Sequence, residues 1–136
     1  MFNNIFVLAF VAGLCFAGWP IIMRATNLNS IWVAILISLG ASIFAISIAI
    51  GKRVAMPSSK ELFIGIIAGL INGVGFFLYS KIVATKSLQL STALPLVAVT
   101  VVIFVAIAGF IVYKEPMTLK KTIGLISAIT AVALLN

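Results

Sequence analysis

The side chains best suited to bind a solute share one apolar stretch: Asn72, Phe76 and Tyr79. Their spacing of four and three residues places them on one face of a helix. An amide in hydrocarbon needs a hydrogen-bond partner, so Asn72 must face protein, water or a ligand. Such an amide beside two aromatic rings could line a pocket for an amphipathic or cationic solute. An interhelical hydrogen bond for Asn72, and a place for Tyr79 in an interfacial aromatic belt, are the alternatives.

Two further residues join this set of candidates. Trp19 lies beside Pro20, late in another apolar stretch, and either faces inward or belongs to the aromatic belt. Pro20 itself predicts a kink or an early end of the helix. Thr100 is central in a third stretch, although such hydroxyls usually bond to their own helix. The candidate residues of a substrate pathway are therefore Trp19, Asn72, Phe76, Tyr79 and Thr100.

Gly65, Gly69 and Gly73 form two overlapping small-xxx-small repeats on the stretch that holds Asn72. Glycine at this spacing clears one stripe of a helix, so that another helix can approach closely. The stripe predicts helix packing, either within the chain, at a subunit interface or along a pathway wall.

The composition excludes most catalytic and metal-binding chemistry within one chain. There is no histidine, one cysteine (Cys15) and only two acidic residues, Glu61 and Glu115. Zinc sites and Ser/His or Cys/His catalysis need residues that are missing here. No apolar stretch carries an acid near its centre, which disfavours a carboxylate-driven proton pathway. We therefore expect no enzyme activity, no cofactor and no metal.

Apolar residues make up 64% of the 136 residues and charged residues only 8%, which is typical of an integral membrane protein. About 20 apolar residues are needed for a helix to cross the hydrocarbon core. Five stretches qualify, without the alternation of a barrel strand. They predict an all-α membrane domain over residues 1–136 with spans at about 4–23, 31–50, 62–83, 92–113 and 117–135.

Polar residues between the stretches predict where the helices begin. Ser58 and Glu61 fit a capping box before the third helix. Ser91 or Thr92 is expected to cap the fourth helix. Pro116 suits the first turn of the fifth helix.

The net charge of +7 predicts orientation, because the basic residues are divided among the connections and form no nucleic-acid-binding face. One side carries Lys52, Arg53, Lys60, Lys114, Lys120 and Lys121. The other side carries Arg24, Lys81 and Lys86. The positive-inside rule then predicts a cytoplasmic N-terminus and an external C-terminus in a plasma membrane, taken as a bacterial inner membrane. Arg24 and Lys81 are expected to reach lipid headgroups, or to attract an anion if they converge.

The second half of the chain contains a recognisable series of motifs. Phe77-Leu78-Tyr79 ends the third stretch, and Ser91-Thr92-Ala93-Leu94-Pro95 opens the fourth. Tyr113-Lys114-Glu115-Pro116 follows, and then Gly124 within the last stretch. This series, with the five-span layout, resembles the EamA-like repeat of the drug/metabolite transporter superfamily.

The resemblance implies one half of an inverted-repeat transporter, because typical members carry two five-helix repeats with the path between them. A single repeat would pair as an antiparallel homodimer, or as a heterodimer with a second small membrane chain. The first four helices would form the path, in agreement with the five candidates above, and the fifth would support packing. The small multidrug resistance proteins are similar in design, but the glutamate of their first span has no counterpart here.

These observations favour a half-size transporter subunit that moves a small neutral, zwitterionic or amphipathic metabolite by alternating access. A subunit of a lipid-linked sugar flippase is one alternative. A non-transporting assembly or regulatory protein, held to its partners through the glycine stripe, is another. A small pore is weaker, because no stretch offers a continuous polar stripe.

Overall fold

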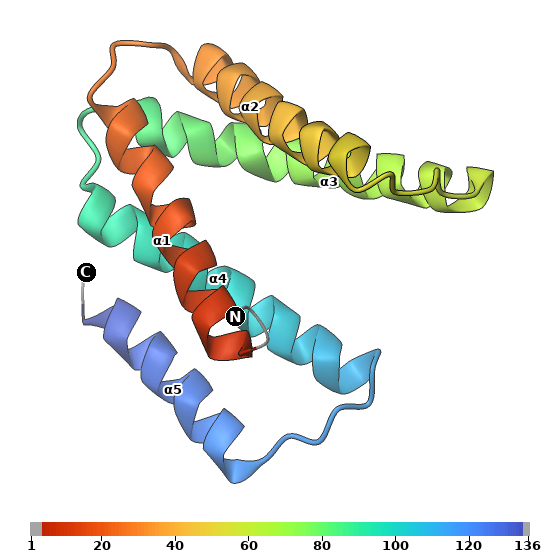
Figure 1. Ribbon diagram of the computed structural model, residues 1–136. Coiled ribbons are helices and arrows are strands. Elements are labelled where there is room, and N and C mark those ends of the chain that lie inside the picture. The colour runs from red at the N-terminus through yellow and green to blue at the C-terminus, as the bar shows by residue number, and fades with distance from the viewer. Residues whose placement is uncertain (1–3, 135–136) are drawn as a thin grey trace. The chain divides into compact units, whose positions relative to one another are not determined.

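The computed structural model describes residues 4–134 as five helices joined by short connections (Figure 1). They are α1 (Ile5–Arg24), α2 (Ser30–Gly51), α3 (Ser59–Ala84), α4 (Leu90–Ile111) and α5 (Leu119–Ala133). Within the described residues there is no strand. The predicted all-α class and the five-helix layout are confirmed.

The first four helices are long and apolar enough to cross a membrane. The fifth is shorter: its 15 residues rise by about 22 Å at 1.5 Å per residue, against a hydrocarbon core of about 30 Å. It begins two residues later than the predicted Met117. The predicted end at Leu135 lies outside the described residues.

The predicted capping box at the start of α3 is confirmed. The Ser58 hydroxyl accepts a hydrogen bond from the Glu61 backbone at 3.4 Å, and the Glu61 carboxylate accepts one from the Ser58 backbone at 2.8 Å. Both donors belong to the first turn, where no helical carbonyl can satisfy them. This end of α3 is therefore fixed by four consecutive residues.

The predicted place of Pro116 in the first turn of α5 is wrong. Thr118 caps this helix, because its hydroxyl accepts a hydrogen bond from the Lys121 backbone at 3.3 Å. Further back, Lys114 has a φ of +53°, and the Glu115 N–H donates to the Gly109 carbonyl at 3.0 Å. This closing turn belongs to α4, so Pro116 lies in the connection.

Two other predicted helix boundaries also need correction. Neither Ser91 nor Thr92 caps α4, which begins at Leu90 after Gln89 without a side-chain cap. The Gln89 carbonyl accepts hydrogen bonds from the backbones of Thr92 and Ala93, and these bonds open the helix. Pro20 does not end α1, which continues through it to Arg24.

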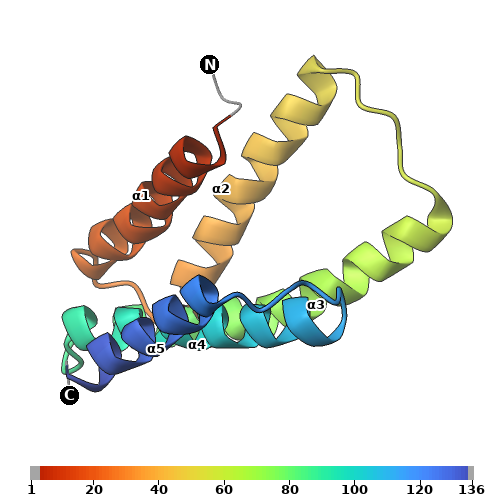
Figure 2. The same cartoon turned by 90° about the horizontal axis from the view of Figure 1, so that it is seen from below.

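The helices divide into two compact units, α1 to α3 and α4 with α5. In the first unit, α3 contacts both α1 and α2. The packed residues gather at the end where α1 and α3 finish and α2 starts, and Pro20, Val33, Ser80 and Val83 are fully buried there. The other end is open: residues 5–17, 38–51 and 59–75 are exposed throughout. Figure 2 shows α2 and α3 diverging toward their long connection.

Arg24 holds the packed end of the first unit together. Its guanidinium donates to the carbonyls of Val83 at 2.9 Å, of Thr85, and of Lys86 at 2.7 Å. In return the Lys86 ammonium donates to the Arg24 carbonyl and, at 2.8 Å, to that of Thr26. The last carbonyls of a helix lack partners and carry partial negative charge, so two cations satisfy both helix ends. The structure thus gives Arg24 partners within the chain, and its contact with headgroups or an anion stays a prediction.

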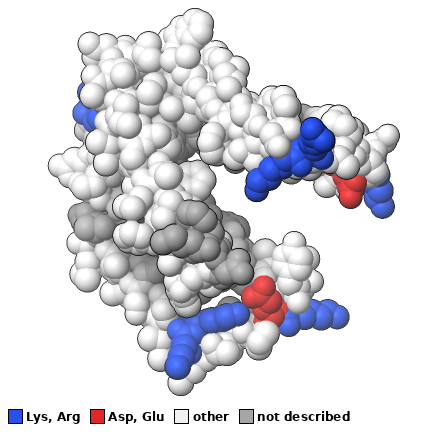
Figure 3. All heavy atoms as spheres, in the orientation of Figure 1, with Lys and Arg blue, Asp and Glu red and all other residues white. Residues whose placement is uncertain are grey.

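In the second unit, α4 and α5 pack as a helical hairpin. The less exposed residues of α5 recur every three or four positions, at Thr122, Leu125, Ala128 and Val132. This spacing is that of one packed face. At the connection, the Lys121 ammonium lies 3.3 Å from the Glu115 carboxylate. Figure 3 shows the charged side chains in view in a few separate groups, with uncharged surface between them.

Candidate functional site

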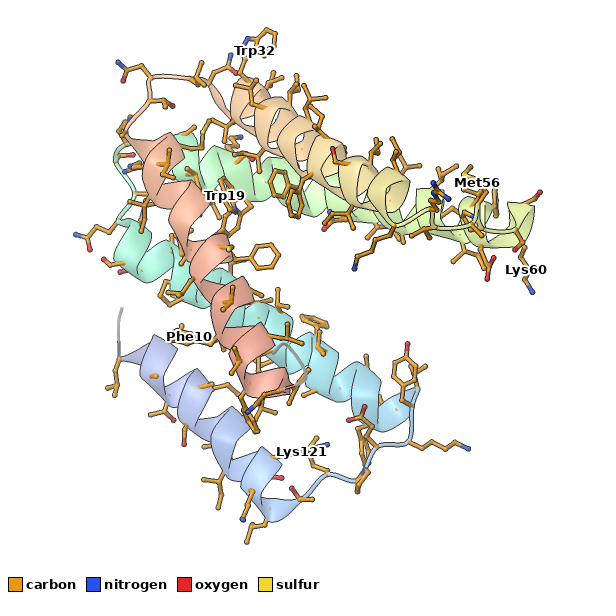
Figure 4. All side chains as sticks on the ribbon, in the orientation of Figure 1. Phe10, Trp19, Trp32, Met56, Lys60 and Lys121 are labelled. Carbon is orange, nitrogen blue, oxygen red and sulfur yellow. The ribbon has the colours of Figure 1, made fainter. Side chains whose placement is uncertain are left out.

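Three of the predicted pathway residues form one aromatic cluster between α1 and α3. The ring centroid of Trp19 lies 5.3 Å from that of Phe76 and 5.2 Å from that of Tyr79 (Figure 4). The rings are tilted by 33° and 51°, within the range that aromatic pairs prefer. All three side chains are only partly buried. Trp19 thus faces inward, and exposed parts of the rings remain available to a solute.

The fourth candidate, Asn72, continues this cluster along α3. Asn72, Phe76 and Ser80 are spaced by four residues and lie on one face of the helix. Burial falls along this face, from the fully buried Ser80 through the partly buried Phe76 to the exposed Asn72. The Asn72 amide makes no hydrogen bond to another described residue. Since an unsatisfied amide is costly in hydrocarbon, it needs a partner other than the described residues around it.

Ser80 is a polar residue of this face that the sequence analysis missed. Its side chain is fully buried, and its hydroxyl has no hydrogen-bond partner among the described residues. A buried hydroxyl without a partner costs free energy, so Ser80 is a polar weak point of this packed end. Its spacing of four residues from Phe76 was the signal that could have found it.

The aromatic cluster has no carboxylate near it in its own unit. The acid of this unit, Glu61, lies 15 residues before Phe76 on α3, which is about 22 Å along the helix axis. It is also held by Ser58. The chemistry that α1 and α3 offer consists of ring faces, an amide and a hydroxyl. These groups suit an amphipathic solute with little net charge.

The fifth candidate, Thr100, lies on α4 and therefore in the second unit. Its hydroxyl donates to the Leu96 carbonyl of its own helix at 2.9 Å. This is the ordinary bonding of a hydroxyl within an apolar helix. Thr100 stays a prediction as a pathway residue.

The predicted packing stripe of Gly65, Gly69 and Gly73 faces open space in the chain. A Cβ atom added at any of the three would meet no atom within 4 Å outside the local helix backbone. The described residues of the first unit therefore do not use the stripe for close packing with one another. Its use by a second chain stays a prediction.

No curated protein and no solved structure matches the chain. The EamA-like transporter family matches residues 3–136, which covers all five helices. The expected resemblance is thereby confirmed: the chain belongs to the EamA-like transporter family, a family of membrane transporters.

Proposed function

We propose that this chain is a transporter subunit that binds a small neutral, zwitterionic or amphipathic metabolite at the aromatic cluster of Trp19, Phe76 and Tyr79. The observation that carries the proposal is the contact of Trp19 with both α3 rings. One of these rings, Phe76, follows Asn72 by about one helical turn, and the Asn72 amide makes no hydrogen bond to another described residue. The rings would hold an apolar or cationic part of the solute. The amide would donate to, or accept from, its polar part.

The shape of the first unit supports alternating access. Its three helices lie close together at the end where Arg24 and Lys86 donate hydrogen bonds to backbone carbonyls. They separate toward the α2–α3 connection. A solute at the cluster would therefore be enclosed at the packed end with Arg24 and Lys86. It would be reachable from the open end near the α2–α3 connection. The positive-inside orientation assigns the open side to the cytoplasm.

A second repeat would complete the pathway. Asn72 and the glycine stripe are exposed on α3, and most large apolar side chains of the chain are exposed as well. Lipid can cover the apolar side chains, but it does not satisfy the amide. We propose an antiparallel second copy, or a second small membrane chain, as the partner that covers this face.

The two tryptophans allow a direct binding test. Trp19 belongs to the cluster, whereas Trp32 lies on α2 with 54% of its surface exposed. A Trp32→Phe variant reports only from the cluster, and a Trp19→Phe variant only from α2. A panel of neutral, zwitterionic and amphipathic metabolites is screened against both in detergent.

We expect a saturable fluorescence change in the Trp32→Phe protein that is absent from the Trp19→Phe protein. Asn72→Leu should weaken that binding at least tenfold while the protein still inserts. Equal changes in both single-tryptophan proteins would contradict binding at the cluster. Stable oligomers that bind no solute would instead favour the assembly-protein alternative.

A further inference from the structure

A second candidate site lies in the other unit, in an open groove between α4 and α5. Its volume is about 720 Å³. The α4 wall is one helical face, marked by Val101, Val105, Gly109 and Tyr113 at intervals of four residues. Gly124 on α5 leaves space opposite, because a Cβ atom added there would meet nothing within 4 Å.

The length of the groove matches one leaflet of a bilayer. From Val101 to its end at Ile111 the α4 helix rises by about 15 Å. Half of the hydrocarbon core measures about 15 Å. Val101 lies at the middle of α4, and Tyr113 lies just beyond its end, where interfacial aromatic residues are common. The groove therefore runs from the bilayer centre to the headgroup region.

The headgroup end of the groove carries one charge of each sign. Glu115 and Lys121 both line it, 3.3 Å apart, and 58% and 52% of their side-chain surfaces are exposed. Both ions can therefore make further contacts. A phosphate near Lys121 and an ammonium near Glu115 would complement this arrangement.

We propose that the groove binds one phospholipid with a primary-amine headgroup, of the phosphatidylethanolamine type. One acyl chain lies along Val105 and Gly109, the phosphate contacts Lys121, and the ammonium donates to Glu115. A quaternary ammonium has no N–H to donate, so a phosphatidylcholine lacks that last hydrogen bond. The site is independent of the aromatic cluster on α1 and α3.

Native mass spectrometry of the purified full chain tests the proposal, with palmitoyl-oleoyl phosphatidylethanolamine and phosphatidylcholine as probes. Gly124→Leu places a side chain in the groove. Gly40→Leu is the matched control, because an added Cβ also meets nothing there and Gly40 lies on α2. We expect one bound lipid, tighter for the primary amine, with at least tenfold weaker binding in Gly124→Leu and unchanged binding in Gly40→Leu.

The headgroup contacts are tested separately, in case Gly124→Leu does not fold. Glu115→Gln should remove the preference for the primary amine and keep the phosphatidylcholine affinity. Lys121→Gln should weaken both lipids. Equal affinity of the wild type for the two lipids would overturn the proposal. So would wild-type lipid binding by Gly124→Leu, or a dimer that this variant breaks without loss of lipid.

Discussion

At the scale of single residues, Arg24 shows why a charge at a helix end is hard to interpret from sequence. Its position after an apolar stretch predicts contact with headgroups. In the structure it bonds to carbonyls of Val83, Thr85 and Lys86, about 60 positions further along the chain. A guanidinium has five donors in a fixed plane, so it can serve several carbonyls at once. Which carbonyls lie within reach depends on how α1 and α3 pack.

We predict that Arg24→Gln lowers the free energy of unfolding by about 2 kcal/mol, because hydrogen bonds to charged groups contribute about 1.5–3 kcal/mol. Denaturation of the purified protein in micelles, followed by circular dichroism, measures this loss. Arg53→Gln is the matched control, because Arg53 is exposed in the α2–α3 connection. If both variants lose the same free energy of unfolding, the hydrogen bonds of Arg24 to the α3 end do not stabilise the packed end.

At the scale of helices, the sequence predicted what local chemistry decides and missed what depends on backbone geometry. The capping box of Ser58 and Glu61 was predictable, because all its bonds lie within four residues. The end of α2 was predicted to within one residue, but the turn that follows it was not. There Arg53 has a φ of +49°, and the Val54 N–H donates to the Ala49 carbonyl in a Schellman turn. Glycine normally takes the left-handed position, so the basic residue concealed this turn.

This turn supports a prediction about α2. We expect Arg53→Gly to be more stable than Arg53→Ala by about 1 kcal/mol, because a left-handed backbone costs an L-residue about 1–2 kcal/mol and glycine almost nothing. Both variants remove the same charge, so their difference isolates the backbone. Chemical denaturation curves of the two proteins give it. Equal midpoints would show that Arg53 does not stay in the left-handed region.

At the scale of the whole molecule, polarity and spacing predicted the candidate residues, but their grouping came from packing. Trp19 contacts rings 57 and 60 positions away, and no local pattern specifies that approach. The spacing of Asn72, Phe76 and Tyr79, in contrast, follows from one helix and was predictable. The place of Ser80 on this face follows from its spacing, but its burial does not, because burial depends on how the helices of the first unit pack.

The exposed glycine stripe supports a prediction about assembly. Gly69→Leu should reduce the dimer fraction in liposomes at least tenfold, measured by energy transfer between labelled copies. An added Cβ at Gly69 meets no atom within 4 Å in its own chain, so a loss of assembly would reflect contact with a second chain. Gly40→Leu again provides the control. An unchanged dimer fraction in Gly69→Leu would remove the stripe from the interface.

We propose that the aromatic cluster of Trp19, Phe76 and Tyr79 binds the solute that the transporter moves. Uptake into proteoliposomes tests it most directly, with a solute found in the single-tryptophan binding screen. We expect saturable uptake by the wild type and by Trp32→Ala, and at least tenfold slower uptake by Trp19→Ala. Wild-type uptake by Trp19→Ala, or no saturable uptake of any solute that binds at the cluster, would contradict it.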